Sequence, residues 1–90
     1  MDDKVLRKAI KKFGKEKQTI VAIEEMSELT KELTKSLRGC NRTSQITEEM
    51  ADVYIMLHQI RLMYGIRDEL LSDYINLKVC RLENNLNERK

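Results

Sequence analysis

The sequence predicts an all-α protein, folded as a small four-helix antiparallel bundle. Three glycines, at positions 14, 39 and 65, divide a chain without proline into four segments, each with the apolar spacing of an amphipathic helix. Charged residues make up 36% of the chain and hydrophobic residues 41%, with few aromatic side chains, which is typical of solvated helices around an aliphatic core. Ninety residues suffice for one core, so residues 1–90 are expected to form a single all-α domain.

The first two helices are expected over residues 3–13 and 15–38. Gly14 and Gly39 follow them and can adopt the left-handed conformation that ends a helix. The apolar side of the first helix consists of Val5, Leu6, Ala9, Ile10 and Phe13. The apolar positions of the second, spaced by threes and fours, are Ala22, Met26, Leu29, Leu33 and Leu37. Both segments therefore have one face for a core and one for water.

The third and fourth helices are expected over residues 44–64 and 68–86. Thr43 or Ser44 can cap the third, and Asp68 can cap the fourth. The apolar positions of the fourth helix are Leu70, Leu71, Tyr74, Ile75, Leu77, Val79, Leu82 and Leu86. They cover an arc of about 200°, more than one small core can bury. Self-association of the chain is therefore expected.

The overall charge and the apolar runs argue against several classes of protein. A formal net charge of +2 is too small by itself to indicate a nucleic acid or an anionic membrane as partner. No apolar run approaches the roughly 20 residues of a membrane helix, and the first residues lack the pattern of a secretory signal. Cys40 and Cys80 form no C-x-x-C pair, which favours reduced thiols. A cytoplasmic protein is expected, without membrane association.

Carboxylates occupy positions where the helical period places core residues. Glu25 lies in one i, i+4 row with Leu29, and Glu28 stands beside that row. Glu49 falls inside an apolar arc of the third helix, and Asp52 borders the arc. Burying an ionised carboxylate costs several kcal/mol, so four of them on an apolar seam require a cation. The sequence predicts such a cation between the second and third helices.

The donor set indicates which cation. Oxygen ligands without His or Cys favour hard ions, and Mg²⁺ or Mn²⁺ is the natural choice. A di-iron bundle would need Glu-x-x-His pairs, and His58, the one histidine, is not at that spacing from any glutamate. We interpret His58 as an ordinary residue of a polar face, and Glu32 and Glu48 as solvated.

The carboxylates also form a recognisable signature. Glu24-Glu25-Met26-Ser27-Glu28, followed after twenty residues by Glu49-Met50-Ala51-Asp52, resembles the E-E-x-x-E … E-x-x-D motif of the MazG-type all-α nucleoside triphosphate pyrophosphohydrolases. Phe13-Gly14 and Gln18 precede the first motif at similar distances, and Gly65-Ile66 closes the third helix in a similar way. The resemblance covers about residues 9 to 83 and is greatest to short, single-domain forms.

The resemblance implies a fold, an activity and an assembly. The expected reaction is metal-dependent cleavage of a nucleoside triphosphate between its α and β phosphates, giving the monophosphate and pyrophosphate. The expected assembly is a homodimer or homotetramer of all-α subunits. The resemblance and the helix geometry together give four candidate ligands of Mg²⁺: Glu25, Glu28, Glu49 and Asp52. Glu24 would position or deprotonate the attacking water, which makes Glu24 and Glu25 the candidate catalytic residues.

Three further side chains are candidates for contact with the substrate. Lys78 and Arg81 fall within the apolar arc of the fourth helix and resemble the family's basic, phosphate-binding helix. The alternative is that their stems lie on the core while their charged ends reach water. Gln18 lies on the side of Glu25 and could hydrogen-bond a base or sugar. Four basic residues near the end of the second helix could form a basic rim around the site: Lys31, Lys35, Arg38 and Arg42. Ordinary solvated charge on a helix explains them equally well.

A different class of function stays open. A small helical adaptor or DNA-binding protein could dimerise through the apolar arc of the fourth helix. A helix-turn-helix reader, however, needs a recognition helix whose start attracts phosphate, whereas the third helix starts with Glu48, Glu49 and Asp52. Nucleic acid is therefore not the expected partner.

Overall fold

The computed structural model describes residues 2–88, and these residues form four α-helices and no strand. The helices are α1 (Asp3–Phe13), α2 (Lys15–Leu37), α3 (Thr43–Met63) and α4 (Asp68–Glu88). The prediction of an all-α chain with four helices is confirmed, and each predicted boundary falls within two residues of the observed one. Within this described range, no helix combines the length and apolar character needed to cross a membrane.

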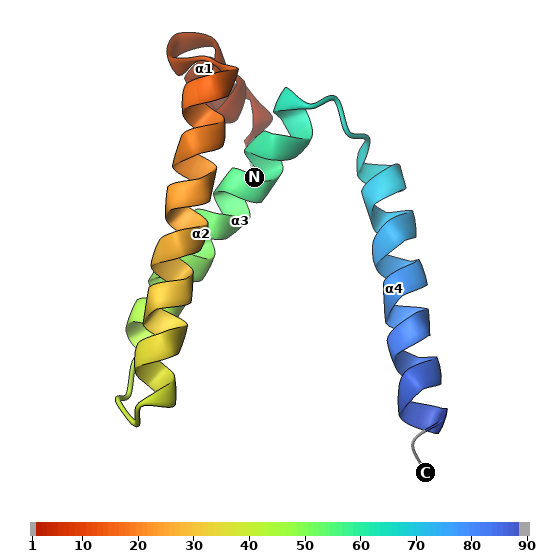
Figure 1. Ribbon diagram of the computed structural model, residues 1–90. Helices are drawn as coiled ribbons and strands as arrows, with labels where there is room; N and C mark the ends of the chain where they lie inside the picture. The colour runs from red at the N-terminus through yellow and green to blue at the C-terminus, as the bar shows by residue number, and fades with distance from the viewer. Residues whose placement is uncertain (1, 89–90) are drawn as a thin grey trace.

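The centre of the fold is an antiparallel pair formed by α2 and α3, with α1 packed against one end of both (Figure 1). Ala22 on α2 is only 1% exposed, and its small side chain lets the two helices approach closely. Val53 and Met56 of α3 and Leu6 of α1 complete the buried apolar core. The core is small and leaves much of the apolar surface of the chain exposed.

The turn from α1 to α2 depends on the backbone of Gly14. Its φ of 91° and ψ of 156° belong to a region that residues with a Cβ rarely adopt. In this conformation the Gly14 N–H donates to the Ile10 carbonyl at 2.8 Å, and the Gly14 carbonyl accepts from the Gln18 N–H at 3.0 Å. One residue thus ends α1 and begins α2.

The predicted N-cap of the third helix, Thr43 or Ser44, was wrong, and Asp68 lies within the fourth helix rather than before it. Arg42 precedes α3, and Thr43 is its first residue, whose N–H donates to Asn41 Oδ1 at 3.3 Å. Asp68 is in the first turn of α4, where its negative charge interacts favourably with the positive end of the helix dipole.

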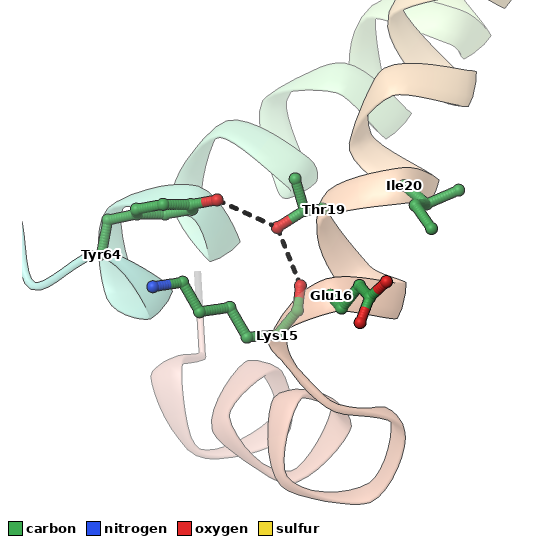
Figure 2. A pocket seen from close by; sticks show the side chains of 5 residues that line it. All are labelled: Lys15, Glu16, Thr19, Ile20 and Tyr64. Atoms are coloured by element: carbon green, nitrogen blue, oxygen red, sulfur yellow. Dashed lines mark hydrogen bonds between the residues drawn. The ribbon is translucent and has the colours of Figure 1, made fainter.

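A contact of Tyr64 links the end of α3 to the start of α2. Its hydroxyl lies 3.3 Å from Thr19 Oγ1, which itself donates to the Lys15 carbonyl at 2.8 Å (Figure 2). The Lys15 ammonium stands 4.1 Å from the centre of the Tyr64 ring, a cation–π distance. These contacts fix the open end of the α2–α3 pair beside α1.

The last helix departs from the predicted bundle. In a single chain α4 leaves the end of α3 and points away from the other helices (Figure 1), and none of its residues is buried. The turn before it is held in place: the Ile66 N–H donates to the Arg61 carbonyl at 2.9 Å, and Arg61 Nη1 donates to the Ile66 carbonyl at 3.3 Å. The four helices therefore do not close into an antiparallel bundle within one chain.

Candidate metal centre

The candidate site lies on the seam between α2 and α3. Glu25 and Glu49 are each half-buried there, and Asp52 is exposed at its edge. One carboxylate oxygen from each of these three residues lies within 4.8 Å of the other two. Two helices far apart in the sequence thus bring three carboxylates to one point.

The proximity of these groups changes how readily they lose protons. The pKa of Glu25 is raised above its usual 4.5, first by burial, then by the negative charge of Asp52 and a hydrogen bond with it, with smaller contributions from Glu49 and Glu28. The pKa of Glu49 is also raised, first by burial and then by Asp52 and Glu28. The folded chain therefore favours a proton or another positive charge at this point.

The other two glutamates of the first motif differ in their relation to this cluster. Glu28 is exposed, and its negative charge contributes to the raised pKa of both Glu25 and Glu49. Glu24 is exposed on α2 and does not belong to the group of converging oxygens. The structure thus brings Glu25, Glu49 and Asp52 together on the seam, and Glu24 and Glu28 both lie outside the group of converging oxygens.

The converging oxygens fit a small divalent ion. Ligand oxygens at about 2.1 Å from Mg²⁺ in octahedral geometry are separated by about 3 to 4.2 Å. The oxygens of the three-carboxylate cluster lie within 4.8 Å of one another, slightly above the longest of these separations. The cluster contains oxygen donors only, and among the described residues no Lys, Arg or His side chain forms an ion pair with any of its three carboxylates.

The expectation that Glu32 is solvated was wrong. Its side chain is buried at the end of the α2–α3 seam, with the residue 8% exposed. Arg42 brings its Nε to 2.8 Å and its Nη2 to 2.7 Å from Glu32 Oε1, and Lys35 Nζ stands 3.7 Å from Oε2. These cations lower the pKa of Glu32, the hydrogen bond from Arg42 being the main cause. Arg42 and Lys35 are thus engaged in the fold rather than free on a basic rim.

Two buried glutamines flank the seam toward α1. Gln18, which we predicted to contact substrate, is buried in the helix packing, so in a single chain it has little surface through which to bind a ligand. Gln59 is 3% exposed, and its Oε1 has no hydrogen-bond partner among the described residues. Sequence analysis did not identify Gln59 as buried. Its i+7 relation to Asp52 places it on the border of the apolar arc, where a polar side chain is ordinarily expected to reach solvent.

The predicted phosphate-binding cations do not join the acidic cluster within one chain. Lys78 and Arg81 are exposed on α4, which stands apart from the α2–α3 seam (Figure 1). His58, in contrast, is not simply a residue of a polar face. It is half-buried, and its Nε2 lies 2.7 Å from Asp3 Oδ1, an interaction that ties α1 to α3.

Comparison of the chain with protein-family models, with curated proteins and with solved structures finds no match. The functional interpretation therefore depends on the residues of the site and on the motif they form.

Proposed function

We propose that this protein is a metal-dependent nucleoside triphosphate pyrophosphohydrolase of the MazG type, which cleaves an NTP or dNTP to the monophosphate and pyrophosphate. The observation that carries the proposal is the convergence of Glu25, Glu49 and Asp52 from two helices. These are the residues that the E-E-x-x-E and E-x-x-D motifs supply. Their convergence on a seam, rather than on a solvated face, supports a role in binding a cation.

The residues of the cluster would divide the work between binding and proton transfer. Glu25, Glu28, Glu49 and Asp52 would hold Mg²⁺ or Mn²⁺, which when bound neutralises phosphate charge and lowers the pKa of a coordinated water. Glu24, adjacent to Glu25 but exposed, would accept the proton of the attacking water. The seam itself fixes Glu25 and Glu49, because their helices are packed together by Ala22 and Val53.

The substrate requires more positive charge than the seam provides. A triphosphate carries close to four negative charges, and the carboxylates of the site carry several more. Lys78 and Arg81 are the proposed phosphate ligands, but in one chain they stand on the detached α4. We therefore include a homodimer or homotetramer in the proposed function, together with a cytoplasmic location, where nucleotide substrates and Mg²⁺ are available.

A nucleotide panel tests the proposed activity. The purified chain is incubated with each NTP and dNTP in the presence of Mg²⁺, and pyrophosphate and monophosphate are measured separately from orthophosphate and diphosphate. We expect pyrophosphate release from at least one nucleotide, and loss of at least a hundredfold in Glu49→Gln, with Glu83→Gln on α4 as the matched control. Absence of cleavage for every nucleotide, or full activity of Glu49→Gln, would contradict the proposal.

A non-enzymatic regulatory or adaptor dimer is the second candidate function. The exposed basic side of α1, which carries Arg7, Lys8, Lys11 and Lys12, favours it. Such a surface would bind an anionic partner in a salt-dependent way. Binding of the inactive chain to duplex DNA, weakening steeply between low and moderate salt, would favour this function over hydrolysis.

A further inference from the structure

The helix α4 lacks the packing that usually stabilises a helix in a protein. It extends over 21 residues without a single buried side chain, whereas most of the stability of a protein helix comes from tertiary packing of its apolar face. Eight large apolar residues of α4 are between 41% and 65% exposed. If each leaves roughly 80–100 Å² uncovered, α4 alone offers about 700 Å², close to the ≈800 Å² that one partner contributes to a stable interface. This surface requires a cover.

One apolar row of α4 becomes more exposed to solvent along the helix. Leu71 and Ile75 line a groove against Leu57, Ile60 and Ile66, which we call the α3–α4 groove; Arg61 also lines it. From this groove toward the end of α4 the exposed fraction rises steadily: Leu71 41%, Ile75 51%, Leu82 58% and Leu86 65%. The two helices therefore diverge, and the space between them widens away from the turn (Figure 1).

The facing surface of α3 is also apolar and uncovered. Met50, Tyr54 and Leu57 lie on one side of α3 at i, i+4 and i+7, and they are 42%, 62% and 49% exposed. Tyr54 and Leu57 adjoin the start of α4. This α3 row and the α4 row from Leu71 to Leu86 thus form the two walls of the same opening.

Contacts within the turn between the helices hold α4 apart from its own α3 in the structure. Besides the two hydrogen bonds between Arg61 and Ile66, Arg61 Nε lies 3.9 Å from Asp68 Oδ1 at the start of α4. These contacts hold α4 in its open position. An occupant of the opening must be apolar and elongated, and a second α4 has both properties.

We propose that two copies of the chain exchange their α4 helices, so that the α4 of each copy packs on the α3 row of the other. In a two-fold dimer each contact between the two chains occurs twice. The α4 row of each chain can therefore cover the exposed α3 row of the other. The charges are compatible: Lys78 lies within the α4 row, and the α3 row begins at Met50, next to the half-buried Glu49. The exchange does not depend on the proposed hydrolysis, and its test has no catalytic readout.

Molar mass in solution tests the assembly. We expect light scattering after size exclusion to give at least twice the 10.6 kDa of one chain. Ile75→Asp and Leu82→Asp should each give monomers, because they place a charge in the buried row. Asn76→Asp adds the same charge on the polar side of α4 and should stay dimeric. A monomeric parent at micromolar to submillimolar concentration would overturn the proposal, as would dimers of both apolar-row variants.

Cross-linking distinguishes exchange from other dimers, and it does not depend on destabilised variants. In a background with Cys40→Ser and Cys80→Ser, one copy carries Tyr54→Cys and a differently tagged copy carries Leu82→Cys. After mixing, a short bismaleimide should yield the mixed dimer as the main product. Predominant links between two Leu82→Cys copies would show α4–α4 pairing alone. Links within one chain carrying both cysteines would show closure on its own hairpin, and either result would refute the exchange.

Discussion

Arg42 Nη2 lies 2.7 Å from Glu32 Oε1 and joins the last residue before α3 to the last turns of α2. The contact closes the loop between the two helices that carry the acidic cluster. Because Glu32 is buried, its charge would be unfavourable without Arg42, and because Arg42 is anchored, α3 begins at a fixed height along α2. The position of α3 along α2 determines whether Glu49 lies opposite Glu25.

Removal of this ion pair should destabilise the fold. Arg42→Met keeps much of the side-chain volume but leaves the buried Glu32 carboxylate with only the more distant Lys35 ammonium as a partner, so the thermal midpoint at pH 7 should fall by several degrees. The lowered pKa of Glu32 means that the pair stabilises the fold above pH 4.5 and that this stability is lost as the pH falls below that value. Thermal unfolding from pH 7 to pH 3 should show this acid-side loss in the parent and not in Arg42→Met. Arg38→Met, at an exposed position, is the control.

Glu25→Gln should have the opposite effect. The pKa of Glu25 is raised, so its ionised form opposes folding above that raised pKa, and the penalty disappears as the pH falls toward 4.5. Removing the charge should therefore raise the thermal midpoint at pH 7 by a few degrees in the absence of divalent ions. The gain should shrink on acidification toward pH 4.5. Glu83→Gln, on the exposed helix α4, should leave the midpoint unchanged; a lower midpoint in Glu25→Gln would show that its carboxylate is not repelled.

A divalent cation should replace the missing positive charge. With Mg²⁺ or Mn²⁺ at ten times its dissociation constant, mass action adds about 1.4 kcal/mol to the free energy of unfolding. The midpoint of the parent should rise on titration with either ion and fall again with a chelator. Glu25→Gln and Glu49→Gln should lose most of this response, while Glu83→Gln should keep it. An equal rise in all three variants would indicate binding elsewhere on the chain.

The features that sequence reasoning predicted are those determined by neighbours along one helix. Four helices followed from apolar periods interrupted by glycine, and the inward direction of Glu25 and Glu49 followed from rows of three and four residues. Burial of Glu32 depends instead on Arg42, ten residues away, which the loop delivers to it. The turn before α4 contains two hydrogen bonds between Arg61 and Ile66, which no apolar period reveals. Periodicity alone therefore predicted a closed bundle.

Gly14, between α1 and α2, and Gly65, after α3, should respond differently to substitution. Gly14 has φ 91° with ψ 156°, a conformation that is essentially limited to glycine, and Gly65 has φ 66°, which asparagine also adopts. Open space surrounds a Cβ at either position, so steric clashes do not contribute. Gly14→Ala should lower the free energy of unfolding by about 1–3 kcal/mol, and Gly65→Asn by much less. Chemical denaturation of both variants measures the difference. Equal losses would mean that the turn after α1 relaxes, and that the conformation of Gly14 does not fix where α1 ends and α2 begins.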